Sequence, residues 1–357
     1  MGDEIMIRFR CWSRLLATLF LVFAFFGVNT AQSESASHPL YLGTAGPMHW
    51  ALGELIVDRF MPVLKEESAG ELELKVFPRG AICSEHGCVE QVMLGMIDMA
   101  TISAGNAGAF GDVFEILNMP YLFSDQQSAS KIMEDWLRDE LAERAERELG
   151  FKVLAITPGG GFRNLVNNRQ SVSFPSDLRH LKLRTTKSAV EIELIRSWGG
   201  RVVPYDWALL YEGLQAGVVD GMYLQNIFTA AAGLSTIVTH ITETQATYSA
   251  HIVVMSAARF YALPLAHQEA LLAAGRAVEE EADEYYQAWL DRSLPALQGR
   301  VEIKSLNAVE RQEWERLSLD AWERLKGRFD PAMVKRVLHE QGRQEFLKQL
   351  EERRVFE

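Results

Sequence analysis

The 357-residue sequence lacks the motifs of several common enzyme classes. It contains no GxSxG nucleophile elbow, no HExxH zinc helix, no GxGxxG dinucleotide fingerprint and no GxxxxGK phosphate loop. Hydrolases, zinc peptidases and nucleotide-dependent enzymes of these types are therefore excluded. An exported enzyme with a different catalytic arrangement remains an alternative.

Cysteine is scarce as well, because the chain has only three, and this excludes a scaffold held by many disulfides. Cys83 and Cys88 are separated by four residues, and in an oxidising compartment such a pair can close a disulfide. Two free thiols are the alternative. A zinc site that uses Cys83, His86 and Cys88 is a weaker interpretation, since a fourth ligand and the usual spacing are missing. No metal or other cofactor is expected.

The N-terminal apolar run, Leu15 to Val28, is shorter than the roughly twenty residues that a membrane-spanning helix needs. Three arginines precede it and polar or small residues follow, which is typical of a secretory signal peptide. We predict a leader of residues 1–31 that is removed on export. A membrane anchor is the alternative.

Basic residues are outnumbered, with 36 Lys and Arg against 48 Asp and Glu, and the formal net charge is −12. Removal of the leader, which holds three arginines and two acidic residues, changes this charge to −13. Binding to nucleic acid rests on lysine and arginine, so no nucleic-acid partner is expected. A site for an anion must create its own positive potential.

The composition, 48% hydrophobic and 24% charged, is that of a folded globular protein. Because 357 residues exceed what one hydrophobic core usually serves, two domains are expected.

Residues 181–221 alternate between strand and helix patterns. The expected elements are a strand at Leu181–Arg184, a helix at Lys187–Trp198, a strand at Arg201–Val203, a helix at Asp206–Ala216 and a β-like run at Val218–Val219. Such a βαβαβ order implies a parallel sheet in an α/β fold.

Arg184 ends the first of these strands, and ligands of open parallel sheets bind outside the carboxyl ends of the strands. Its guanidinium is a planar fork of donors that suits a carboxylate. A structural salt bridge is the alternative for a single arginine. Trp207 stands in the first turn of a helix capped by Asp206, where amide donors favour an anion; a core tryptophan is equally consistent with the pattern.

Further motifs carry a resemblance to a known family. Their order along the chain is KVFPRGAI, LGMIDMATIS, NMPYLF, GFRNLVNN, PSDLRHLKLR, YEGLQAGVVDG and RFYALPLAHQEALLAA. This order resembles that of the solute-binding (DctP-type) subunits of tripartite ATP-independent periplasmic (TRAP) transporters. The resemblance extends from about Leu40 to Leu350.

The resemblance implies a two-lobed periplasmic binding protein fold with a hinge and a ligand cleft between the lobes. Lobe I would comprise residues 39–160, completed by about 249–290. Lobe II would comprise residues 161–248, completed by about 291–357. The C-terminal helices would brace the two lobes.

The resemblance also implies a site. The arginine at the position of Arg184 pairs with the substrate carboxylate, and one at the position of Arg163 assists it. We expect Arg163 to lie nearer the solvent edge of the crevice. The other candidates for substrate contact are Trp50, Asn106, Trp207, Tyr223, Gln225 and Asn226. Many family members have asparagine where this chain has Leu224, and this difference favours a more apolar carboxylate.

The predicted function is that of a monomeric periplasmic receptor, not an enzyme, which delivers an organic acid to the integral membrane subunits of a TRAP transporter. A ligand-sensing partner of a membrane receptor kinase is an alternative with the same fold.

Overall fold

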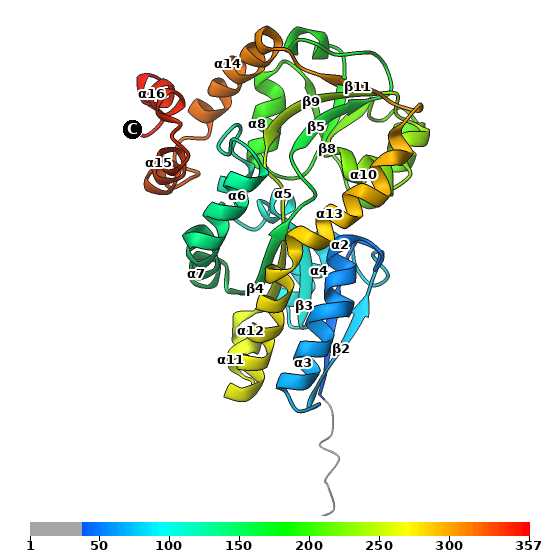
Figure 1. Ribbon diagram of the computed structural model, residues 1–357, viewed down its shortest axis with the longest axis vertical. Helices are drawn as coiled ribbons and strands as arrows, with labels where there is room; N and C mark the ends of the chain where they lie inside the picture. The colour runs from blue at the N-terminus through cyan, green and yellow to red at the C-terminus, as the bar shows by residue number, and fades with distance from the viewer. Residues whose placement is uncertain (1–37) are drawn as a thin grey trace, which may run out of the picture. The chain divides into compact units, whose positions relative to one another are not determined.

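The computed structural model describes residues 38–357, so the predicted signal peptide lies outside the described residues. The described chain is an α/β fold built on two β-sheets with helices packed around each (Figure 1). None of the helices within residues 38–357 combines the length and the apolar composition of a membrane-spanning segment.

The first sheet has five strands in the order β2-β1-β3-β10-β4. Strand β1 is parallel to β2 and β3, whereas β10 is antiparallel to both of its neighbours. The strands are β1 His38–Gly43, β2 Leu72–Phe77, β3 Met99–Ser103, β4 Phe151–Pro158 and β10 Ala250–Ser256. A strand from late in the chain thus completes a sheet made by its beginning.

The second sheet has six strands in the order β11-β9-β5-β8-β6-β7. They are β5 Arg163–Asn167, β6 Lys182–Thr185, β7 Arg201–Pro204, β8 Gly221–Gln225, β9 His240–Thr247 and β11 Glu302–Ser305. Strand β6 is parallel to β7 and β8, which confirms the parallel pairing predicted from the βαβαβ order. The sheet as a whole is mixed, because β5 is antiparallel to β8 and β9.

One strand prediction was wrong in its position. Val218 and Val219 precede β8 instead of belonging to it, and the backbone N–H groups of both residues bond to the carbonyl of Gly213 at the end of a helix. Val218 is also exposed. The strand itself begins at Gly221, whose missing side chain lets the backbone of Asn167 and Val166 approach.

The helices are α2 Ala51–Leu55, α3 Met61–Glu67, α4 Glu85–Met93, α5 Ala104–Ala107, α6 Gln126–Ile132, α7 Arg138–Leu149, α8 Ala189–Ser197, α9 Leu210–Gln215, α10 Asn226–Ala231, α11 Ala257–Tyr261, α12 Leu265–Glu280, α13 Ala282–Ser293, α14 Ala308–Arg324, α15 Pro331–Glu340 and α16 Gln344–Glu352. In Figure 1, α2, α3, α11 and α12 surround the first sheet, and α8, α10 and α14 surround the second. Helices α12 and α13 meet at the non-helical Glu281.

The two sheets share their hydrophobic core. One cluster of buried residues combines Ile102 of β3 with Leu165 of β5, and a second combines Leu42 of β1 with Leu224 of β8. Helix α13 contacts both α2 and α10. In the C-terminal part, α14 packs on α8, and the Trp322 indole donates to the carbonyl of Pro120 at 3.0 Å. The described residues therefore form one body in which late helices join both sheets.

Cys83 and Cys88 form a disulfide, with their Cα atoms 5.1 Å apart. The bond joins the turn before α4 to the helix itself. Both sulfur atoms lie close to Gly43 at the end of β1, where a Cβ would be 2.6 Å from the Cys88 Sγ. The disulfide therefore packs the start of α4 against the first sheet.

A buried carboxylate, Glu115, joins α8 to the 3₁₀ helix Glu115–Asn118. Its Oε2 accepts from the Ser188 hydroxyl at 2.6 Å, and its Oε1 accepts from the Ala189 backbone N–H at 2.9 Å. Burial raises the pKa of Glu115 to about 7, against hydrogen bonds that lower it, and nearby Glu191 adds to the rise. The folded protein therefore holds the proton of Glu115 more tightly than the unfolded chain does.

We expect the free energy of unfolding to depend on pH through Glu115. Because its folded pKa of about 7 lies above the ordinary 4.5, its stabilising effect is complete below about pH 4.5 and is lost as pH rises to about 7. The loss is on the order of 3 kcal/mol. Urea unfolding at several pH values should show this slope in the parent and a flatter one in Glu115→Gln. Equal slopes in the two proteins would contradict the assignment.

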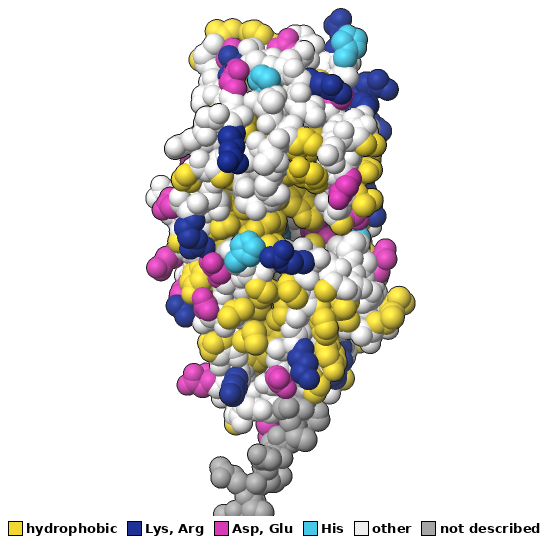
Figure 2. All heavy atoms as spheres, turned by 90° about the vertical axis from the view of Figure 1, so that its right-hand side faces the viewer, with side chains coloured by type: hydrophobic (Ala, Val, Ile, Leu, Met, Phe, Trp, Pro, Cys, Tyr) yellow, Lys and Arg dark blue, Asp and Glu magenta, His cyan; other side chains and the backbone are white. Residues whose placement is uncertain are grey.

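Acidic and basic side chains are interspersed on the face of the molecule in Figure 2, among hydrophobic ones, and the basic side chains do not gather in one patch.

Candidate functional site

A cavity of about 90 Å³ lies among segments that follow strands of both sheets. Its wall includes Ser103 at the end of β3, Thr186 after β6 and Gln225 at the end of β8. The carboxyl ends of parallel strands are where ligands of such sheets bind. The structure brings six of the eight predicted contact residues to this wall: Trp50, Asn106, Arg163, Arg184, Trp207 and Gln225.

Arg184 is a buried cation without a carboxylate partner. Its side chain is 2% exposed, and its Nε donates to the carbonyl of Tyr205 at 2.9 Å. It forms no ion pair with any residue of the described chain. Burial lowers the pKa of Arg184 to about 10, while the charges of Glu191, Glu85 and Asp206 act in the opposite direction. The guanidinium therefore stays protonated at neutral pH and has donors to offer a ligand.

Arg163 is equally buried but already has a charge partner. Its Nε lies 3.1 Å from the Glu191 Oε1, without the alignment of a hydrogen bond, and its Nη1 donates to the carbonyl of Tyr223 at 3.2 Å. The expectation that Arg163 lies nearer the solvent was wrong, since it is 3% exposed. The reason is that β5 is an interior strand, with β8 and β9 on either side.

Helix α5 from the first sheet packs directly on this ion pair. A Cβ on Gly105 would lie 2.5 Å from the Glu191 Oε1 and 3.1 Å from the Arg163 Nη2. Only glycine permits so close an approach of the backbone. Arg163 on the second sheet is thereby covered by a segment that follows a strand of the first.

Asn106 and Gln225 each present a carbonyl oxygen without a partner. The Asn106 Nδ2 donates to the Glu85 carboxylate at 2.6 Å, and the Gln225 Nε2 donates to the carbonyl of Gly159 at 2.9 Å. These bonds orient both amides, and the Asn106 Oδ1 and Gln225 Oε1 are left buried and unbonded in the described chain. Both oxygens have almost no accessible surface, so they lie behind the surface of the cavity wall.

Four aromatic side chains, Trp50, Trp207, Phe228 and Trp289, form an aromatic wall on another part of the cavity. The ring of Trp50 is 6.2 Å from Trp207, 5.2 Å from Phe228 and 5.5 Å from Trp289, measured between centroids. No sequence pattern indicated Phe228 and Trp289, because an apolar position on a helix looks the same whether it faces a core or a ligand.

Two predicted contact residues do not line the cavity. Tyr223 lies on the opposite face of β8 from Leu224, where its ring packs on Trp198 at 5.6 Å and its hydroxyl accepts from Thr247. Asn226 bonds to Asn164 at 2.9 Å and to Glu243 at 3.2 Å. Leu224 lines the cavity instead, since alternate residues of a strand face opposite sides.

Glu85 and His251 are cavity residues that no sequence motif indicated. Glu85 accepts from the backbone N–H of Ser103 at 2.6 Å. Burial lowers the pKa of His251 to about 4, so that imidazole is neutral near pH 7. Its Nδ1 lies 3.3 Å from the hydroxyl of Tyr286.

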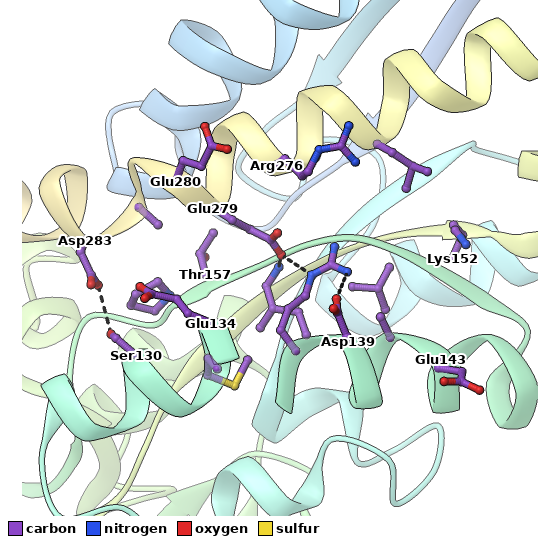
Figure 3. Close-up of a pocket in the computed structure, with 18 of the residues that line it drawn as sticks. Ser130, Glu134, Asp139, Glu143, Lys152, Thr157, Arg276, Glu279, Glu280 and Asp283 are labelled. Atoms are coloured by element: carbon purple, nitrogen blue, oxygen red, sulfur yellow. Dashed lines mark hydrogen bonds and ion pairs between the residues drawn. The ribbon is translucent and has the colours of Figure 1, made fainter. Parts of the chain in front are cut away.

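A larger groove of about 930 Å³ lies between α7, β4 and α12 (Figure 3). Arg138 is paired there with Glu279 at 2.9 Å and with Asp139 at 3.0 Å. Its lining has more acidic than basic side chains: Glu134, Asp139, Glu143, Glu146, Glu279, Glu280 and Asp283 against Arg138, Lys152 and Arg276. This groove therefore has the wrong charge for an acid, and the smaller cavity is the candidate site.

Residues 50–327 match the family model DctP, described as "Bacterial extracellular solute-binding protein, family 7". The chain belongs to this family. The resemblance predicted from the sequence motifs is thereby confirmed.

Two relatives share 30% identity with the chain. A solute-binding protein of Verminephrobacter eiseniae matches over 220 residues, or 62% of this chain and 65% of its own length, just under two thirds. The 2,3-diketo-L-gulonate-binding periplasmic protein YiaO of Escherichia coli matches over 251 residues, or 70% of this chain and 71% of its own length.

A solved structure shows the same fold. The TRAP periplasmic solute-binding protein of Bordetella bronchispeptica, in which ligand density is interpreted as pantoate, has a TM-score of 0.78 and 23% identity, and the match covers 84% of this chain and 98% of that one. The predicted two-lobed α/β class is therefore confirmed, and the cavity of this DctP-family member lies among segments of both sheets. The lobe boundaries proposed from the sequence stay a prediction.

Proposed function

We propose that this DctP-family protein is a receptor that captures an organic acid through its carboxylate, with Arg184 as the main contact. The observation that carries the proposal is a buried guanidinium on a cavity wall with one carbonyl bond and no ion pair in the described chain. A buried charge without an ion-pair partner destabilises the folded protein unless a ligand pairs with it. Arg163 contributes positive potential, although its charge is largely balanced by Glu191.

The relatives support this class of ligand. The name of the Escherichia coli protein gives 2,3-diketo-L-gulonate as its ligand, and the Bordetella structure has density interpreted as pantoate. Both compounds are organic acids. The family and the fold are those of solute-binding proteins. The alternative, an exported enzyme, differs from a receptor because an enzyme would convert the bound acid into a product.

In the proposed cycle, two lobes close over the acid, and the closed form delivers it to the membrane subunits of a TRAP transporter. Lobe I comprises residues 39–160 and about 249–290, and lobe II the remainder of the mature chain. A sensing partner of a membrane receptor kinase would use the same cavity. Reconstitution of acid uptake with the membrane subunits separates the two, since only the transport role predicts uptake that depends on this protein.

A thermal-shift screen of organic acids tests the proposal. An acid at about a hundred times its dissociation constant should stabilise the protein by roughly 2.7 kcal/mol and raise the melting temperature accordingly. Neutral amides of the same acids serve as controls and should give no shift, because they have no charge for Arg184. Equal shifts from an acid and its amide would contradict a carboxylate site.

We further propose that the protein is exported and that residues 1–31 are removed. Expressed with its own leader in a Gram-negative host, the protein should appear in the periplasm, and its intact mass should be lower by about the mass of residues 1–31. A full-length product retained in the membrane would contradict the proposal.

The periplasmic protein should also contain no thiol that an alkylating tag can reach without reduction, because Cys83 and Cys88 are bonded to each other.

A further inference from the structure

We propose, on the basis of the function above, that the Cys83–Cys88 disulfide is a positioning element of the site. It fixes Glu85 so that the carboxylate of this residue holds helix α5 and stays out of an ion pair with Arg184. The disulfide thus keeps the buried guanidinium available to an acid. Three observations lead to this role: the place of Glu85 inside the disulfide loop, the hydrogen bonds of its carboxylate, and the cavity wall that it shares with Arg184.

Glu85 lies inside the short loop that the disulfide closes, two residues after Cys83 and three before Cys88. Both sulfur atoms pack on Gly43 at the end of β1, where a Cβ would lie 2.6 Å from the Cys88 Sγ and 2.9 Å from the Cys83 Sγ. Helix α4 begins within this loop, at Glu85. Because a covalent bond joins the ends of the loop and its sulfur atoms pack on the sheet, the backbone of Glu85 is held in place beside β1.

The carboxylate of Glu85 holds the segment that follows β3. Its Oε1 accepts from the backbone N–H of Ser103 at 2.6 Å, and its Oε2 accepts from the Asn106 Nδ2 at 2.6 Å. These bonds join the start of α4 to α5, whose Gly105 backbone packs on the ion pair of Arg163. Both donors are neutral, and Glu85 forms no ion pair within residues 38–357. Its negative charge is therefore held by neutral groups alone in the described chain.

Glu85 and Arg184 line the same cavity without forming an ion pair in the described chain. Burial lowers the pKa of Arg184, and the charge of Glu85 acts in the opposite direction, so the two charges interact. A buried charge gains most from an opposite charge that it can contact. A Glu85 side chain released from Ser103 and Asn106 can therefore pair with Arg184 and compete with the carboxylate of a ligand. The disulfide prevents this competition.

Amide hydrogen exchange of the empty protein tests the first step without a ligand. In the double variant Cys83→Ala with Cys88→Ala, the amide of Ser103 should exchange about tenfold faster than in the parent, because its acceptor Glu85 is no longer fixed. Mass spectrometry of a peptide that covers residues 99–107 measures this rate. Unchanged exchange in the cysteine variant overturns the proposal.

Asp330→Ala is the control for a general loss of stability. It removes the side-chain cap of α15, a helix that does not line the cavity. The amide of Ser103 should exchange at the parent rate in this variant. The same rise in Asp330→Ala as in the cysteine variant would show that exchange reports global stability, which overturns the proposal.

Calorimetry tests the second step with pantoate and 2,3-diketo-L-gulonate, and the acid that binds the parent more tightly is the probe. The cysteine variant should bind it about tenfold more weakly. Glu85→Gln keeps the shape of the side chain and removes its charge, so in this background the cysteine substitutions should change the affinity by less than about threefold. An unchanged affinity in the cysteine variant, or a tenfold loss in both backgrounds, overturns the proposal, since a purely structural effect does not depend on the charge of Glu85.

Failure of this proposal is distinguishable from failure of the carboxylate receptor. If an acid binds equally to the parent and to the cysteine variant, the receptor function stands and the role of the disulfide is wrong. If neither acid binds the parent, exchange at Ser103 alone decides whether the disulfide positions Glu85. If no acid of the thermal-shift screen binds either, the receptor function is wrong.

Discussion

Arg184→Ala should weaken binding of the acid by about 3 to 5 kcal/mol, the range found when one member of a buried ion pair is removed. The bound carboxylate would remain in a buried site, and the other arginine there is already balanced by Glu191. The empty protein should lose little stability, because Arg184 makes a single carbonyl bond and its burial as a charge is itself unfavourable. Calorimetry with the acid and thermal melts without it measure the two effects separately.

Arg184→Lys is the matched control. It keeps the charge but replaces a two-pronged donor with a point charge, so it should recover only part of the affinity. If Arg184→Ala binds as tightly as the parent, or if its empty form melts far lower, the arginine is a structural element and not the carboxylate contact.

Arg163→Ala should lower the stability of the empty protein by about 3 to 5 kcal/mol, because it leaves the carboxylate of Glu191 buried without its cation. The expected loss of stability is larger than that for Arg184→Ala, although the two arginines are equally buried. Among residues 38–357, the carboxylate of Glu191 would retain only the backbone N–H of Thr186 as a hydrogen-bond donor, at 3.0 Å. Urea unfolding of the ligand-free protein measures the loss.

A double variant, Arg163→Met with Glu191→Gln, provides the control for this prediction. It removes both charges at similar side-chain volume, and it should regain much of the stability that Arg163→Ala loses. A stable Arg163→Ala would show that the ion pair contributes little. Ligand binding alone would then explain why Arg163 is buried at this site.

Local patterns in the sequence were sufficient for several elements of the fold. The alternation of Leu181–Arg184 and the helical spacing after it correctly predicted the parallel pairing of β6, β7 and β8. Asp206 does cap the helical segment that follows it, since its side chain accepts from the backbone N–H of Ala208. These features depend on residues a few positions apart, which is why a linear pattern predicts them.

The pairing of side chains within the site could not be predicted in this way. Arg163 and Arg184 are both arginines at strand ends, and nothing in their own segments distinguishes the one that is balanced by Glu191 from the one that is not. Tyr223 and Leu224 are neighbours, and the register of β8 against β5 decides which of them faces the cavity. A shift of one residue would exchange them.

The α/β class, the family and an arginine at the end of a parallel strand were all evident in the sequence, because periodicity and motif order are local properties of the chain. The folded arrangement was needed to show which arginine is free, which amide oxygens are unbonded, and that Phe228 and Trp289 join Trp50 and Trp207 in one wall. These outcomes depend on contacts between residues far apart in the chain, and such contacts are set by the tertiary packing that joins the two sheets in shared clusters of buried residues.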